Sequence, residues 1–136
     1  MASSGKTSSD TPRNEVGAAR RVLLVEDNDD VREMIRVYLE SFGIVVSEAA
    51  DGPSGLHTAL RERPDLVLMD LGLPGMDGFS LARAIREGDP QGAIRIVAMS
   101  GYGEEQVAHR MQPGLIDRWL LKPIAPDVLL EVIEKS

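Results

Sequence analysis

The chain has no cysteine among its 136 residues, which excludes a disulfide framework and a thiolate metal site. No apolar stretch approaches the ~18 residues of a membrane-spanning helix, and the N-terminus lacks the apolar core of a secretory signal. Hydrophobic residues make up 43% of the sequence and charged residues 27%, as is usual for a soluble globular protein. We therefore expect a cytoplasmic protein with one domain and a substantial core.

Positive charge is also scarce. The formal net charge is −7, which argues against direct binding of nucleic acid, because that binding needs a basic surface. Clustered acidic residues instead supply the oxygen ligands that Mg²⁺, Ca²⁺ and Mn²⁺ prefer. Lysine occurs only at Lys6, Lys122 and Lys135, so Lys122 is the single lysine in the long central part of the chain.

Common nucleotide-binding and hydrolase motifs are absent. The sequence has neither a GxGxxG fingerprint nor a GxxxxGK[ST] loop, and Gly72, Gly75 and Gly78 do not have the spacing of either motif. Both histidines, His57 and His109, fall in expected helices. A Ser-His-Asp triad is therefore not supported.

Residues 1–19 differ in composition from the rest of the chain. They are rich in Ser, Thr, Gly and Ala and show no hydrophobic periodicity. We expect residues 1–20 to be a disordered tail or linker and residues 21–136 to form the folded domain.

The remainder alternates between two kinds of hydrophobic pattern. Apolar runs that predict strands occupy residues 22–26, 44–46, 66–70, 94–99 and 118–121. Segments that predict helices occupy residues 29–42, 53–63, 77–87, 104–111 and 126–135. Five strands that alternate with five helices predict an α/β fold, in which helices cover both faces of a parallel sheet because right-handed crossovers dominate.

Four of the predicted strands end in polar residues that are suited to chemistry, which are Glu26-Asp27, Asp70, Ser100 and Lys122. The carboxyl ends of parallel strands meet at one edge of a sheet, where ligands bind. The pattern therefore predicts one pocket with three carboxylates, a hydroxyl and an amine. Mutual repulsion among the acids between Glu26 and Asp30 favours a bound cation there.

Each of these residues also has a purely structural interpretation. Asp27, Asp29 and Asp30 are suited to satisfying the free backbone amides at the start of the helix that follows, and Asp70 and Ser100 are common turn residues. Lys122 would then be an exposed cation at a strand end. Trp119, the only tryptophan, is by itself best interpreted as a core aromatic residue.

Taken together, these residues resemble the receiver domain of two-component response regulators. The resemblance covers about residues 21–135 and rests on four motifs in order: Val25-Glu26-Asp27-Asn28, the run from Met69 to Gly78 (MDLGLPGMDG), Ser100-Gly101 and Leu121-Lys122-Pro123. It implies a (βα)5 flavodoxin-like, doubly wound fold with strand order 2-1-3-4-5.

The resemblance also implies a chemistry for the strand ends. Asp70 would be the phosphoacceptor, a carboxylate nucleophile that attacks a phosphohistidine of a partner kinase. Mg²⁺ would be held by Asp27, Asp70 and the backbone carbonyl of Gly72, with Glu26 acting through a coordinated water. Lys122 would pair with a phosphoryl oxygen, or with Asp70 before transfer.

The resemblance further implies how the phosphoryl group is read. The Ser100 hydroxyl would donate to it, and Trp119 stands at a switch position where tyrosine or phenylalanine is more usual. Gly72 and Tyr102 occupy the positions that tune dephosphorylation, and Tyr102 is expected to shield the phosphoryl group. A downstream protein would contact the face formed by the helix at 104–111, the strand at 118–121 and the last helix.

The implied partners are a histidine kinase or phosphotransfer domain, and weak homodimers are a further expectation. The protein would be no enzyme beyond its own phosphotransfer and autodephosphorylation. Because the sequence ends soon after the last expected helix, we expect no attached output domain. It would be a stand-alone receiver or, as slightly favoured, the receiver of a hybrid histidine kinase with residues 1–20 as linker.

Two other function classes remain alternatives. One is a receiver-like module that binds proteins without phosphorylation, against which the complete set of acids, Ser100 and Lys122 argues. The other is a haloacid-dehalogenase-like phosphatase, which would need a second aspartate two residues after Asp70, where Gly72 stands.

Overall fold

A computed structural model describes residues 20–103, 106, 109 and 112–135 of the chain. Five parallel strands form one sheet in the order β2-β1-β3-β4-β5, which confirms the predicted fold and strand order. The strands are β1 (Arg21–Val25), β2 (Val45–Ala49), β3 (Leu66–Asp70), β4 (Arg95–Ser100) and β5 (Arg118–Leu121). The helices are α1 (Asp29–Glu40), α2 (Gly52–Glu62), α3 (Gly78–Glu87) and α4 (Pro126–Glu134).

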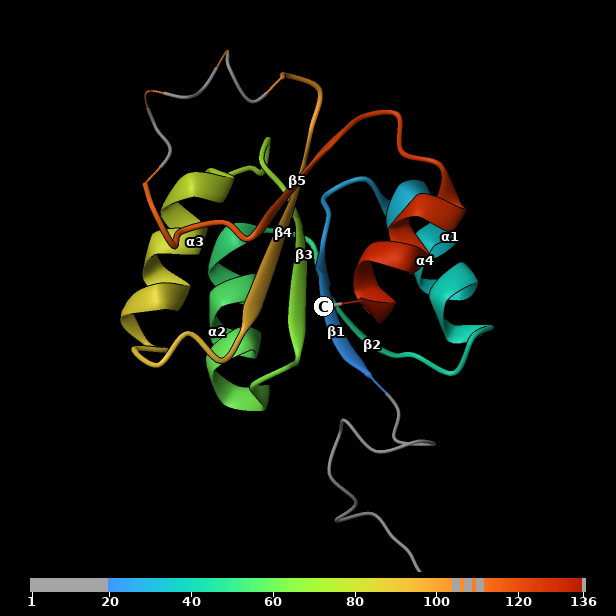
Figure 1. The fold of residues 1–136 in the computed structure, drawn as a ribbon, viewed down its shortest axis with the longest axis horizontal. Coiled ribbons are helices and arrows are strands. Elements are labelled where there is room, and N and C mark those ends of the chain that lie inside the picture. The colour runs from blue at the N-terminus through green and yellow to red at the C-terminus, as the bar shows by residue number, and fades with distance from the viewer. Residues whose placement is uncertain (1–19, 104–105, 107–108, 110–111, 136) are drawn as a thin grey trace, which may run out of the picture.

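The helices cover the two faces of the sheet in pairs. Figure 1 shows α2 and α3 on one side and α1 and α4 on the other. Successive residues of a strand point to opposite faces, so Leu23 and Val25 pack toward α2 and α3, while Val22 and Leu24 pack toward α1 and α4. Burial on both faces explains why the central strands read as continuous apolar runs rather than as alternating patterns.

Side-chain caps fix where the first three helices begin. Asn28, Asp51 and Asp77 each accept a hydrogen bond from the backbone N–H three residues further on, which satisfies a donor that the helix itself leaves free. The structural interpretation of Asp27 as the cap of α1 is therefore wrong, because Asn28 fills that position.

Some predicted boundaries differ from the observed ones. The second strand, predicted at residues 44–46, runs from Val45 to Ala49 and includes the polar Ser47 and Glu48. Polar residues are tolerated because every side chain of this edge strand except that of Ala49 is exposed or half-buried. The predicted helix at 104–111 falls mostly outside the described residues, as does the predicted tail or linker at 1–20. No described helix is both long enough and apolar enough to cross a membrane.

The pairing register aligns the carboxyl ends of the strands. Val25 is opposite both Ala49 and Met69, and Asp70 is opposite Met99. On the other side of β4, Ser100 is opposite Leu121. The residues at the ends of β1, β3, β4 and β5 therefore lie along one edge of the sheet, as the sequence predicts.

Candidate functional site

The acidic pair after β1 consists of one buried and one exposed carboxylate. Glu26 is only 2% exposed, and its Oε2 accepts a hydrogen bond of 3.0 Å from the Asn28 N–H. Asp27 is exposed. Burial raises the pKa of the Glu26 carboxyl above its usual value, with a smaller contribution from the charge of Asp70.

Asp70, at the end of β3, is held through both of its carboxylate oxygens. Its side chain is 13% exposed; Oδ1 accepts from the Gly72 N–H at 3.0 Å, and Oδ2 accepts from Lys122 Nζ at 3.0 Å. Lys122 Nζ also lies 3.8 Å from Glu26 Oε1. Lys122, which follows β5 and precedes a cis peptide bond to Pro123, therefore bridges the carboxylates at the ends of β1 and β3.

The three carboxylates form a donor set suited to a divalent cation. One oxygen from each of Glu26, Asp27 and Asp70 lies within 4.8 Å of the others. Glu26 Oε1 is buried and has no hydrogen-bond partner in the described part of the chain, an arrangement that is costly unless another charge compensates it. Carboxylate oxygens are the ligands that Mg²⁺ prefers, so these residues fit the ion that the sequence implies.

Gly72 borders this cluster. Its backbone N–H contacts Asp70, and a Cβ built at this position would lie 3.8 Å from Asp70 Oδ1, an ordinary van der Waals distance. Any side chain at residue 72 would therefore stand beside the candidate phosphoacceptor. Glycine leaves that space open.

Ser100, at the end of β4, is 3% exposed. Its Oγ accepts a hydrogen bond of 2.9 Å from the Tyr102 N–H, and its carbonyl accepts one of 2.7 Å from the Lys122 N–H. The ends of β4 and β5 are thus joined beside Asp70. The Tyr102 side chain is 64% exposed.

Trp119 combines the core position with a polar contact. Its ring packs against the core below α2 and α3, with its centroid 6.0 Å from that of Phe79. Its Nε1–H donates to the Tyr102 carbonyl at 3.2 Å. Trp119 is therefore partly buried at the margin of the core, and its indole also contacts the loop that follows Ser100.

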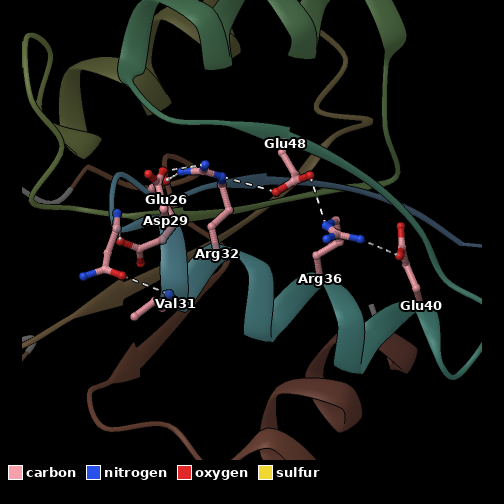
Figure 2. A network of polar contacts seen from close by, with 8 residues as sticks. Glu26, Asp29, Val31, Arg32, Arg36, Glu40 and Glu48 are labelled. Atoms are coloured by element: carbon pink, nitrogen blue, oxygen red, sulfur yellow. Dashed lines mark hydrogen bonds and ion pairs between the residues drawn. The ribbon is translucent and has the colours of Figure 1, made fainter.

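Sequence reasoning missed Arg32. Figure 2 shows this side chain of α1 between Glu26 and Glu48, and its Nη1 donates to the Glu26 carbonyl at 2.8 Å. The chain has 12 arginines, and nothing in the sequence distinguishes Arg32 from the others. Its partner is a backbone carbonyl, which every residue has.

The comparisons with known sequences agree on one family. The family model described as "Response regulator receiver domain" matches residues 22–134. Chemotaxis protein CheY of Bacillus subtilis is 36% identical over 120 residues, which cover 87% of this chain and 98% of that protein. Transcriptional regulatory protein YxdJ of B. subtilis is 36% identical over 116 residues, 85% of this chain but 49% of YxdJ. The chain thus spans about half the length of the transcriptional regulators that it matches.

Solved structures support the same assignment. CheY4 of Vibrio cholerae aligns with a TM-score of 0.79 and 28% identity, covering 87% of this chain and 98% of that one. The receiver domain of the sensor histidine kinase PA1611 from Pseudomonas aeruginosa, solved with magnesium in its active site cleft, gives a TM-score of 0.76 and 30% identity, covering 87% and 97%. With the fold, the strand-end cluster and a family model that spans most of the chain in agreement, the protein belongs to the response regulator receiver domain family.

Proposed function

We propose that the protein is a phosphoacceptor switch of a two-component system, in which Asp70 receives a phosphoryl group from a histidine kinase or phosphotransfer domain. Receiver domains interact with such proteins. The observation that carries the proposal is the convergence on Asp70, where Lys122 Nζ lies 3.0 Å from Oδ2 and the acidic pair completes a cluster within 4.8 Å.

In the transfer step, a carboxylate oxygen of Asp70 attacks phosphorus while the bond from phosphorus to the histidine nitrogen breaks, and that nitrogen keeps the electron pair. The Gly72 N–H and Lys122 hold the two oxygens of Asp70 separately, which restricts rotation of the carboxylate. Such positioning supplies much of the catalysis in phosphoryl transfer.

The chain's candidate ligands for Mg²⁺ are Asp27, Asp70 and the Gly72 carbonyl, with Glu26 acting through a coordinated water. Receiver domains bind Mg²⁺ in an acidic pocket. When bound, the ion neutralises charge on the transferring phosphoryl group. The buried Oε1 of Glu26 supports this assignment. It has no hydrogen-bond partner among the described residues and lies 3.8 Å from Lys122 Nζ, so a bound cation would further compensate its burial.

Ser100 and Lys122 would read the phosphoryl group after transfer. The Ser100 oxygen accepts from Tyr102, an interaction that uses a lone pair and leaves the hydroxyl hydrogen available to donate to a phosphoryl oxygen. Lys122 would move its contact from Asp70 to another phosphoryl oxygen. The hydrogen bond from the Lys122 N–H to the Ser100 carbonyl joins the ends of β5 and β4. A movement of one of these strand ends would therefore move the other.

We further propose that a downstream protein reads a surface that includes β5 and α4. The sequence also assigns to it the predicted helix at 104–111, most of which lies outside the described residues. Trp119 is the candidate switch residue on this face, since its indole contacts the backbone of the loop after Ser100. A movement of that loop toward the phosphoryl group would break or redirect the indole hydrogen bond.

The test follows Trp119 fluorescence while Mg²⁺ and then beryllofluoride, a phosphoryl mimic, are added. We expect a saturable change with Mg²⁺ and a second change with beryllofluoride, because the only tryptophan contacts the loop beside the site. In Asp70→Asn the beryllofluoride response should vanish.

The matched control is Asp127→Asn, which removes an exposed carboxylate from the first turn of α4 and should respond as the native chain does. A native protein that responds to neither addition would contradict the proposal. So would an Asp70→Asn variant that responds to beryllofluoride as strongly as the native protein, and that result would favour a binding module without phosphorylation.

A further inference from the structure

Arg32 joins three elements through all three nitrogens of its guanidinium. Nη1 donates to the Glu26 carbonyl at 2.8 Å, Nη2 donates to Asp29 Oδ1 at 2.7 Å, and Nε donates to Glu48 Oε1 at 3.2 Å (Figure 2). The Arg32 side chain is 18% exposed. Its contact with the Glu26 carbonyl is partly buried, whereas those with Asp29 and Glu48 lie at the surface. A planar group with all its nitrogens engaged has little freedom to move.

The contact with Glu26 fixes a particular peptide unit. The Glu26 carbonyl belongs to the planar peptide that joins Glu26 to Asp27, so its direction sets ψ of Glu26 and φ of Asp27. These two torsions set where the Asp27 carboxylate lies relative to that of Glu26, which β1 already places. The Glu26 N–H is already held by the Ala49 carbonyl at 3.0 Å, and the Arg32 contact fixes the opposite side of the residue.

Arg32 is itself anchored to the rigid part of the fold. Glu48 of β2 accepts from Arg32 and forms an ion pair of 3.1 Å with Arg36 Nε, while Arg36 Nη1 lies 3.0 Å from Glu40 (Figure 2). The network runs along α1 and across to the edge strand. Arg36 shares Glu48 with Arg32, and the contact with the Glu26 carbonyl is made by Arg32.

We propose that Arg32 is a positioning residue for the cation site, which holds the peptide between Glu26 and Asp27 in the orientation that Mg²⁺ binding requires. The inference rests on the proposed function, since it concerns the affinity of the same acidic cluster. Groups that orient metal ligands commonly change metal affinity by about 10–100-fold when they are removed.

The sign of the effect separates positioning from simple electrostatics. A guanidinium next to an acidic cluster repels a divalent cation, so loss of its charge alone would tighten Mg²⁺ binding. Loss of positioning would weaken the binding. Arg32→Gln therefore gives opposite results under the two explanations.

The experiment measures Mg²⁺ affinity by titration calorimetry for the native chain, Arg32→Gln and the control Arg36→Gln. We expect Arg32→Gln to bind Mg²⁺ at least ~10-fold more weakly. Arg36→Gln removes the same charge one turn further along α1 and should bind as tightly as the native chain, or slightly more tightly. Thermal unfolding without Mg²⁺ shows whether each variant is folded at the titration temperature.

Arg32→Lys provides a second variant in case Arg32→Gln does not fold. Lysine keeps the charge but has one nitrogen in place of three, so we expect its Mg²⁺ affinity to fall between those of the native chain and Arg32→Gln. Unchanged or tighter binding by Arg32→Gln, or equal weakening by Arg36→Gln, would overturn the role of Arg32. Absence of Mg²⁺ binding by the native chain would instead overturn the proposed cation site itself.

Discussion

At the scale of single residues, the backbone and the side chain of Tyr102 have different roles. Its N–H and carbonyl contact Ser100 and Trp119, whereas its ring is largely exposed. A substitution at this position therefore changes the side chain and keeps both backbone contacts, which makes Tyr102 a clean test of shielding.

We expect Tyr102→Ala to lose its phosphoryl group faster than the native chain, because the ring would no longer hinder a water that approaches Asp70. A barrier lowered by about 1 kcal/mol corresponds to a several-fold faster rate. Decay of the phosphorylated protein, followed by mass spectrometry, measures this. Tyr102→Phe keeps the ring and should decay at the native rate; equal rates in the native and alanine forms would refute shielding.

Glu26 gives a prediction about pH. Burial raises the pKa of its carboxyl above the usual value of 4.5, so in the absence of a divalent cation the folded protein binds the proton more tightly than the unfolded chain does. Stability from this group is therefore highest below the unfolded pKa and is lost as the pH rises through the folded pKa. The ionised form of Glu26 is therefore the form that lowers the free energy of unfolding.

Glu26→Gln should consequently raise the free energy of unfolding at neutral pH without Mg²⁺. This gain should shrink as the pH falls through the raised pKa of the folded state, and little of it should remain below 4.5. Urea unfolding at several pH values measures the difference. Glu33→Gln, at an exposed position of α1, serves as control. A gain that does not change with pH would contradict the assignment of the effect to the buried charge.

At the scale of elements, the sequence predicted best where burial determines the pattern. The bounds of β3 agree at both ends, since each of its first four residues is buried. The edge strand β2 was misplaced because residues of intermediate or full exposure leave no continuous apolar run. The start of α1 at residue 29 was predicted correctly. Its cap was not, because several neighbouring acids are also capable of capping and only the backbone geometry distinguishes them from Asn28.

The candidate site was predictable to the extent that it depends on strand ends. Asp70 and Lys122 come from β3 and β5, and their 3.0 Å contact follows from a parallel sheet whose carboxyl ends share an edge. The contact of Arg32 with a carbonyl was not predictable, because no residue type marks a backbone acceptor. The burial of Glu26 Oε1 without a hydrogen bond from the described residues likewise depends on packing that a sequence pattern does not contain.

At the scale of the whole molecule, the carboxylates at the carboxyl edge of the sheet lower the stability of the fold, although the proposed function needs them. Three carboxylates lie within 4.8 Å of one another, and Lys122 contacts two of them. Like charges at this separation destabilise the fold when no cation is present. The apolar layers on both faces of the sheet stabilise the rest of the domain. This stability compensates for the repulsion within the cluster.

Asp27→Asn should therefore raise the melting temperature in the absence of Mg²⁺, because it removes one of the repelling charges. The same variant should lose most of the stabilisation that Mg²⁺ gives, which for the native chain is about 2.7 kcal/mol at 100 times the dissociation constant. Asp30→Asn is the matched control, since Asp30 is exposed in the first turn of α1, where a negative charge is favourable. Asp30→Asn should have a slightly lower melting temperature than the native chain and should keep the full stabilisation by Mg²⁺. Calorimetric scans measure both quantities. Equal changes in melting temperature for the two variants, with and without Mg²⁺, would show that the cluster does not act as one cation site.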